Sequence, residues 1–389
     1  MQAKATSTAK GKRALLIALL LLLLLPAVQA KFKIVYVAPL GGYDANTTPR
    51  RHPVLEWDSL KSNAYQSSLE NYLESGLGFR EWFIRLRNQA SYSIFKVARA
   101  NHVIIGHDRV LYEEQPIHAY LGDDFVGRDI VQQRVQRFRV VQDTLAKRGK
   151  LLVFVAAPSK ASYMPEYLPD SYRNRWPSNT TNYRAYADAM RAMGVNFLDL
   201  SRAFRQWKDT TSYPLFPRGG IHWSLYGAAL AGDTLLRYLE NQYHHDLRDY
   251  RVARGDVTRY PRYNDNDILK AMNLLWQPPA YLMAYPKVTF QPLKPGQQRP
   301  NLLLIGDSFN WLLIDPFIKE AFDSKQTRFW YYNSEVAWPE DRPEGHVVSM
   351  LNRKQEYLSR DIIVVLFTEY NMINLDGGFS DDAYTLFTH

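Results

Sequence analysis

The hydrophobic residues of the chain gather in five nearly continuous runs, which lie between stretches of helical spacing. A run that is apolar at every position is typical of a strand buried on both faces of a parallel sheet. The predicted strands cover residues 151–157, 195–200, 302–305, 328–332 and 362–367, and the predicted helices between them cover 183–193, 225–243, 312–322 and 350–358. This alternation predicts an α/β fold, with a parallel, doubly wound sheet of about five strands and helices on both faces.

Other segments surround this pattern. Residues 65–100 and 129–148 have helical spacing, and His107-Asp108 separates two short apolar runs as the turn of a hairpin does. Residues 244–300 interrupt the alternation with many arginines and tyrosines, a short predicted helix at 267–275 and a proline-rich end. We therefore divide the chain into an N-terminal segment 1–38, a linker 39–64, and one domain 65–389 with an insertion at 244–300.

The N-terminus has the pattern of an export signal. Basic residues at 10–13 come before an unbroken apolar stretch at 14–25, and mostly small residues follow at 26–30. This arrangement is typical of a secretory signal peptide with a cleavage site. Because residues 32–38 are largely apolar again, the stretch also fits an uncleaved membrane anchor, which we favour slightly. Both interpretations place the rest of the chain outside the cytoplasm, in the periplasm or cell envelope.

Composition narrows the functional classes. The 389 residues contain no cysteine, which excludes disulfides, zinc–thiolate sites, iron–sulfur clusters and a cysteine nucleophile. Lys and Arg number 48 against 39 Asp and Glu, so a formal charge of +9 is spread along the chain. This diffuse excess suits an acidic polymer or a lipid surface, and together with export it argues against nucleic-acid binding. No histidines have metal-ligand spacing and no glycine-rich phosphate loop occurs, so we expect neither a metal nor a nucleotide cofactor.

One serine stands where α/β enzymes place their chemistry. The block Gly306-Asp307-Ser308-Phe309 directly follows the predicted strand 302–305. Gly306 allows a sharp turn, and the Ser308 N–H and the start of the next helix can face a developing oxyanion. An ordinary strand–helix turn with Ser as N-cap has the same pattern, so this block alone does not establish a nucleophile.

His222 is the candidate base that such a serine requires at neutral pH. It lies in Gly219-Gly220-Ile221-His222-Trp223-Ser224, a loop immediately before the predicted helix 225–243. The alternative interpretation is a histidine that only packs at the helix N-terminus.

Together, the Ser308 and His222 blocks resemble those of SGNH hydrolase-like domains of the AlgX/AlgJ type. The histidine comes first in the chain, whereas ordinary GDSL esterases have the serine near the start and the histidine near the end. Residues 105–112 and 156–160 add to the resemblance, which covers about residues 65–375. The resemblance implies an SGNH-like, flavodoxin-like sheet and O-acetylation of alginate or a related polysaccharide outside the cytoplasm. It also implies a membrane-bound O-acyltransferase partner that supplies the acyl group.

One position departs from the family pattern. Better-known members have Asp two positions before the histidine, where this sequence has Gly220. The carboxylate that orients the imidazole must then come from elsewhere. Glu369 is our candidate, because it lies just beyond the last predicted strand, at the sheet edge expected to hold Ser308. A backbone carbonyl in this role, or a domain that no longer catalyses, are the alternatives.

Five further residues are candidates for contacts to the substrate or the oxyanion. Asp307 adjoins the nucleophile, and Asn371 and Asn333 follow strand ends, where either can donate to an oxyanion. Lys160 follows the strand 151–157, where it can contact an anionic sugar. Trp223 either packs the histidine loop or offers a platform for the acceptor sugar.

The sequence therefore predicts a membrane-tethered, extracytoplasmic enzyme. Ser308 forms an acyl-enzyme with His222 as base, and a polysaccharide hydroxyl accepts the acyl group, which we take to be acetyl. One alternative is a carbohydrate or acyl esterase, in which water replaces the sugar and the acyl-enzyme is the same. The other is a non-catalytic polysaccharide-binding protein of the acetylation machinery.

Overall fold

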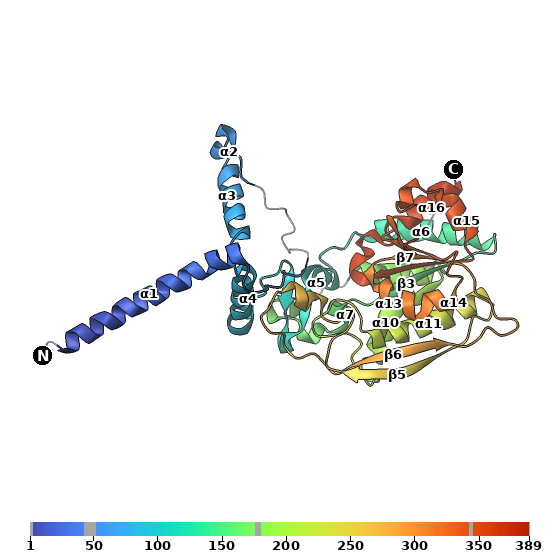
Figure 1. Ribbon diagram of the computed structural model, residues 1–389. Helices are drawn as coiled ribbons and strands as arrows, with labels where there is room; N and C mark the ends of the chain where they lie inside the picture. Colours follow the sequence, from blue (N-terminus) through green and yellow to red (C-terminus); the bar gives the residue numbers. More distant parts are fainter. Residues whose placement is uncertain (1–2, 43–51, 176–179, 342–344, 389) are drawn as a thin grey trace. The chain divides into compact units, whose positions relative to one another are not determined.

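The computed structural model describes residues 3–42, 52–175, 180–341 and 345–388 (Figure 1). The chain forms two compact units, Met1–Asn101 with Leu269–Gln277, and His102–Ile268 with Pro278–His389. Residues 43–51 of the predicted linker lie outside the described residues, and a short helix α2 (Trp57–Lys61) occupies part of the remainder.

The first unit begins with the helix α1 (Ala3–Phe32). Within it, Gly11–Phe32 is long and apolar enough to cross a membrane, a property that a signal sequence shares. The charged residues of this stretch are confined to its ends, at Lys12, Arg13 and Lys31. Three helical segments follow α2: α3 (Ala64–Ser75), α4 (Arg80–Ala90) and the π-helical turn η1 (Ser91–Phe95).

Part of the insertion belongs to this first unit. The buried amide of Asn88 in α4 donates to Met272 O at 2.9 Å, and Gln89 Oε1 accepts from Trp276 N at 3.1 Å. Because these amides satisfy backbone groups that would otherwise be unpaired, they hold the segment Leu269–Gln277 against α4.

The second unit is built on a six-stranded sheet with the order β4-β3-β10-β7-β8-β9. The first five strands are parallel, and β9 pairs antiparallel with β8. Their bounds are β4 (Phe197–Asp199), β3 (Leu151–Ala157), β10 (Ile362–Thr368), β7 (Leu302–Gly306), β8 (Arg328–Tyr331) and β9 (Glu335–Trp338). The five predicted strands are confirmed, and β9 adds a short edge strand with one fully buried residue, Val336.

The strand order explains why the histidine block precedes the serine block. If the parallel strands are numbered from β7 to the end of the chain and then on from β3, the strands β7, β8, β10, β3 and β4 become numbers 1 to 5. Their order across the sheet, β8-β7-β10-β3-β4, is then 2-1-3-4-5. That is the flavodoxin-like order. The chain thus begins the sheet with the fourth of these strands, β3, as in a circular permutation. The segment after the fifth strand, β4, therefore precedes the first strand, β7, in the sequence.

Helices cover both faces of the sheet (Figure 1). Alternate strand residues such as Leu152, Phe154, Ile305 and Val365 pack with Phe138 in one buried cluster. The helices of that face are α6 (Arg128–Ala146), α9 (Asn182–Ala192), α15 (Arg353–Ser359) and α16 (Phe379–Thr388). The opposite face holds α10 (Leu200–Trp207), α11 (Leu225–Tyr243), α13 (Trp311–Leu313) and α14 (Lys319–Ala321), joined to α13 by the π-helical turn η5 (Ile314–Ile318).

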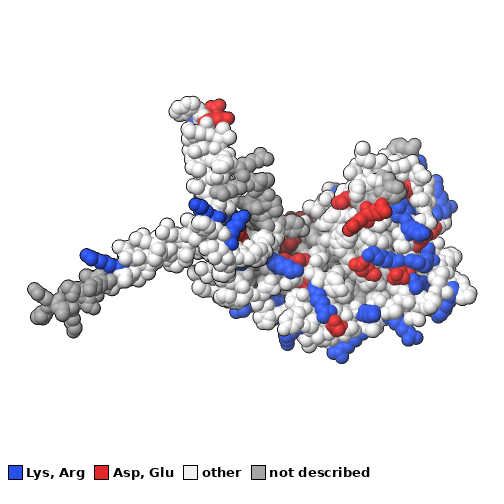
Figure 2. Space-filling view, in the orientation of Figure 1, with Lys and Arg blue, Asp and Glu red and all other residues white. Residues whose placement is uncertain are grey.

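Smaller elements complete this unit. The predicted hairpin is confirmed as β1 (Val103–Ile105) and β2 (Leu111–Glu113), and the short helices are α5 (Glu114–Leu121), α7 (Lys160–Tyr163) and α8 (Asp170–Arg173). The insertion forms an antiparallel pair, β5 (Tyr250–Thr258) and β6 (Met283–Phe290), and the first two residues of a short helix α12 (Asp267–Ala271) also belong to this unit. The β5 strand was not predicted, because it is mostly exposed and rich in charge. In Figure 2, basic and acidic side chains are interspersed over the face of this unit that is in view.

Candidate active site

The candidate nucleophile lies at the carboxyl edge of the sheet, directly after β7. Ser308 begins a 3₁₀ turn, and Asp307 caps that turn by accepting from Phe309 N at 3.1 Å. Gly306 makes the turn possible, because a Cβ at this position would lie 1.9 Å from Leu366 O in the neighbouring strand β10. The close approach of β7 and β10 therefore requires glycine before the Asp-Ser pair.

His222 reaches this serine from the loop before α11. Its Nε2 lies 2.8 Å from Ser308 Oγ, within the hydrogen-bond distance that a base for this serine requires. The Phe309 ring packs against the imidazole with centroids 5.0 Å apart. Ser224, which caps α11 by accepting from Gly227 N, fixes the loop where it enters the helix.

Asp267, a residue of the insertion, supplies the carboxylate that orients His222. Its Oδ2 lies 2.7 Å from His222 Nδ1, and its Oδ1 accepts from Ile221 N at 2.9 Å. One carboxylate thus holds both the ring and the backbone of the preceding residue. With Nδ1 bound to Asp267 and Nε2 facing Ser308, the three side chains have the connectivity of a Ser-His-Asp triad.

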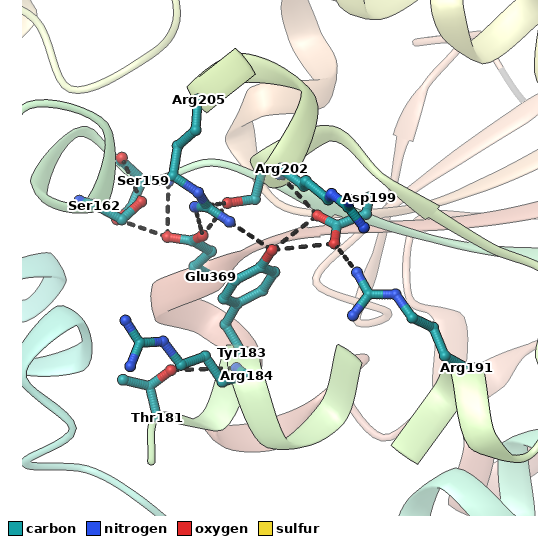
Figure 3. A network of polar contacts seen from close by, with 11 residues as sticks. Ser159, Ser162, Thr181, Tyr183, Arg184, Arg191, Asp199, Arg202, Arg205 and Glu369 are labelled. Atoms are coloured by element: carbon teal, nitrogen blue, oxygen red, sulfur yellow. Dashed lines mark hydrogen bonds and ion pairs between the residues drawn. The ribbon is translucent and has the colours of Figure 1, made fainter. Parts of the chain in front are cut away.

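The prediction that Glu369 orients His222 is wrong. Glu369 does lie just past β10 and is 7% exposed, but its carboxylate binds residues other than His222. It accepts from Arg205 Nη1 at 3.1 Å, from the Ser201 hydroxyl and from Ser159 Oγ at 3.3 Å (Figure 3). An ion pair with an arginine held by α10 has therefore taken the place of the expected contact.

The backbone before Asp267 occupies the space that a side chain at position 220 would need. A Cβ built on Gly220 would lie 2.4 Å from Asn264 O and 2.9 Å from the carbonyl carbon of Asp265. The backbone leading to Asp267 thus occupies the position where the family's aspartate side chain would begin. The only local sequence signal for Asp267 is the run Asn264-Asp265-Asn266-Asp267 at the start of a short helix. This run by itself indicates no catalytic role.

The two asparagines predicted near the oxyanion differ in where they point. Asn371 Nδ2 donates to Asp307 Oδ2 at 2.8 Å, next to the nucleophile, and lies 3.3 Å from the Tyr332 hydroxyl oxygen. Asn333 Nδ2 instead donates to Gly377 O at 3.4 Å. Asp307 itself is fully buried and also accepts from the backbone and hydroxyl of Thr368, so it joins the serine turn to the end of β10 and does not face a substrate.

Lys160 and Trp223 support the histidine loop from within, which corrects the predicted sugar contact of Lys160 and agrees with the packing interpretation of Trp223. Lys160 is 2% exposed and its Nζ donates to Arg218 O at 2.8 Å and Gly220 O at 2.9 Å. Burial lowers the pKa of Lys160 to about 7. Trp223 is fully buried, and its ring stacks on Phe204 with centroids 5.7 Å apart.

A second carboxyl group near the histidine was missed by the sequence analysis. Glu113, at the end of β2, is close enough to Asp267 and His222 to interact with their charges. Burial, and next the charge of Asp267, raise the pKa of Glu113. It follows directly on residues 105–112, whose sequence indicates a hairpin turn and a family resemblance but no acidic partner for His222.

The residues around this triad match a known family. The family model for the SGNH hydrolase-like domain of the acetyltransferase AlgX matches residues 103–325, more than half of the chain, and this range contains all three triad side chains. The chain belongs to this family. Its members are acetyltransferases, and the fold class and the resemblance predicted from the motifs are confirmed.

Several solved structures are similar to this chain at low sequence identity. The O-acetyltransferase domain of Pseudomonas putida AlgJ is 20% identical, with 73% of this chain and 99% of that chain covered at a TM-score of 0.47. Pseudomonas aeruginosa AlgX is 14% identical, with 72% and 67% covered and a TM-score of 0.47. Bacillus cereus PatB1 is 11% identical, with 72% and 100% covered and a TM-score of 0.43. No curated protein sequence matches the chain.

Proposed function

We propose that the protein is an extracytoplasmic O-acetyltransferase that modifies a polysaccharide through an acyl-enzyme on Ser308. The observation that carries this proposal is the continuous hydrogen-bonded series from Asp267 through His222 to Ser308, with distances of 2.7 and 2.8 Å. Membership of an acetyltransferase family supports the acyl group assigned here. The apolar stretch Gly11–Phe32 supports export and tethering at a membrane.

The reaction has two half-steps. In the first, Ser308 Oγ attacks the acetyl carbonyl of the donor while His222 Nε2 takes the hydroxyl proton, and the protonated histidine then returns this proton to the leaving group. In the second, His222 takes the proton of a sugar hydroxyl, whose oxygen attacks the acetyl-serine, and Ser308 is released with its proton restored. Asp267 keeps Nε2 available for both transfers and stabilises the imidazolium.

The oxyanion of each tetrahedral intermediate is assigned to the Ser308 N–H and the Asn371 amide. Asn371 is held beside the nucleophile through Asp307, and its contact with the Tyr332 hydroxyl, at 3.3 Å, is long enough for a substrate oxygen to replace. Because acetyl-CoA is confined to the cytoplasm, the donor is expected to come from a membrane-bound O-acyltransferase partner, as the family resemblance implies.

The test is the activity of the full-length protein in detergent micelles, assayed by hydrolysis of an activated acetyl ester and by mass spectrometry of the trapped acetyl-enzyme. Ser308→Ala should lose activity by several orders of magnitude and carry no acetyl group at residue 308. Ser334→Ala, which removes an exposed hydroxyl elsewhere, is the matched control and should behave as wild type. Equal turnover by Ser308→Ala and wild type would rule out the acyl-enzyme. Addition of an oligosaccharide acceptor then separates transferase from esterase, since a transferase gives an acetylated sugar.

A further inference from the structure

A second hollow lies at the same sheet edge, apart from Ser308. It is a cavity of about 660 Å³, lined in part by residues at or just beyond the carboxyl ends of β3, β4 and β10. Ser162, Asp199 and Glu369 are among those residues, and α9 and α10 contribute others (Figure 3). Ligands of open α/β sheets bind outside the carboxyl ends of the strands, and a cavity of this volume is in the range of small-molecule sites.

Arginines dominate the lining of this cavity. Five line it, Arg128, Arg184, Arg191, Arg202 and Arg205, against three acids, Asp188, Asp199 and Glu369. Two of the arginines are already neutralised, because Arg191 pairs with Asp199 and Arg205 pairs with Glu369 (Figure 3). These pairs fix the inner wall, so the charge left for a ligand comes from the other three.

Three guanidinium groups are available to a ligand. Among the described residues, Arg128, Arg184 and Arg202 have no acidic partner within ion-pair distance, and all three are exposed. In Figure 3, the marked contact of Arg184 is the bond from its backbone to the Thr181 side chain, and its guanidinium extends free of the pairs beside it. Unpaired arginines in a concave site focus a positive potential, and their planar forks match carboxylate oxygens.

The remaining lining suits a sugar that carries this charge. The Tyr183 hydroxyl is held by Asp199 at 2.9 Å and by Arg205 at 2.7 Å, so its ring has a fixed position in the wall. Tyr120, Ser162 and Thr181 also line the cavity with hydroxyl groups, of which Ser162 Oγ donates to Ser159 O at 3.0 Å and Thr181 Oγ1 accepts from Arg184 N at 3.2 Å. The combination of ordered ring, hydroxyls and free guanidinium groups is typical of a site for a polar, acidic ligand rather than an apolar one.

One glycan chain can span the distance between this cavity and Ser308. In the sheet, β10 and β3 separate β7, which precedes Ser308, from β4, which ends at Asp199. Three strand spacings amount to about 15 Å, a distance that a short run of linked sugars can span.

We propose that this cavity binds a carboxylate-bearing sugar of the acceptor polysaccharide and thereby holds the chain while a neighbouring unit is acetylated at Ser308. The acceptor role rests on the proposed function, whereas the binding of an acidic sugar does not.

The experiment is isothermal titration of the full-length protein in detergent micelles with a galacturonic acid tetrasaccharide. A neutral glucose tetrasaccharide and inorganic phosphate serve as the other ligands. Arg184→Gln and Arg202→Gln should each weaken tetrasaccharide binding by about tenfold, as expected for one charged hydrogen bond. Arg237→Gln, an exposed arginine of α11 outside the cavity, is the matched control and should bind as wild type. The neutral tetrasaccharide should not bind measurably, and hydrolysis of an activated acetyl ester should be unchanged in all three variants.

Two results would overturn the assignment. Equal affinity of wild type and the Arg184→Gln/Arg202→Gln double variant for the acidic tetrasaccharide would place its binding elsewhere. Phosphate binding that is as tight as tetrasaccharide binding, and lost in the same variants, would make the cavity a site for free anions. If Ser308→Ala leaves ester hydrolysis intact but the arginine variants still lose the acidic sugar, the proposed chemistry fails and the cavity assignment stands.

Discussion

Replacement of Asp267 by Asn is the change that separates the observed triad from the one expected from sequence. The Asp267 carboxylate lies 2.7 Å from His222 Nδ1 and balances the imidazolium that forms during acyl transfer. For unit charges about 4 Å apart at an effective dielectric constant of about 20, their attraction is about 4 kcal/mol. Loss of that attraction in the transition state corresponds to about a 10³-fold decrease in kcat. An asparagine amide that donates to Nδ1 would also favour the wrong tautomer.

The assay is hydrolysis of an activated acetyl ester by full-length protein, with thermal unfolding recorded in parallel. Asp267→Asn also weakens one bond to Ile221 N, which costs about 1 kcal/mol of stability and leaves the protein folded. Glu369→Gln is the matched control, because it removes a carboxylate from the same sheet edge that does not touch His222. It should keep kcat within about threefold while it lowers the unfolding temperature, since Arg205 loses its partner. The reasoning is refuted if Asp267→Asn retains kcat or if Glu369→Gln loses as much.

Three further predictions concern neighbouring parts of the site. Gly220→Asp should not rescue Asp267→Asn and should itself destabilise the protein, because its Cβ would lie 2.4 Å from Asn264 O; restored hydrolysis in the double variant would contradict this. Asn371→Ala should lower kcat by about 10²-fold or more, whereas Asn333→Ala should be neutral, and equal effects would remove the oxyanion assignment. Burial lowers the pKa of Lys160 to about 7, against about 10.4 in the unfolded chain. Between those pH values only the unfolded chain holds that proton, so wild-type stability should rise with pH relative to Lys160→Met in denaturant titrations, and parallel profiles would refute the shift.

The sequence determined the elements and the two central residues of the site. Short continuous apolar runs such as 362–367 favour a strand buried on both faces, and the five runs predicted as strands were all found in the sheet. Ser308 and His222 were also predictable, because their local blocks place each side chain in a loop beside a strand end or a helix start. Their mutual contact then follows from the shared carboxyl edge of a parallel sheet.

Tertiary structure alone decided which carboxylate meets His222. Glu369 and Asp267 are both acids near the ends of regular elements, and sequence favoured Glu369 because strand β10 fixes its place at the edge. The sequence does not specify the direction of the Glu369 side chain. This side chain turns toward Arg205, whose position depends on the packing of α10. Asp267 comes from an insertion with little periodicity, so its approach depends on the space left by Gly220.

The same limit applies to Lys160 and to the arginine-lined cavity. A lysine after a strand is ordinarily exposed, and only the loop folded over Lys160 turns it into an internal donor for Arg218 O and Gly220 O. The arginines of the cavity come from α6, α9 and α10, and no short sequence contains them together. Local patterns specify which residues form strands, helices and turns, but the partners of a buried charge are chosen by packing between segments distant in the chain.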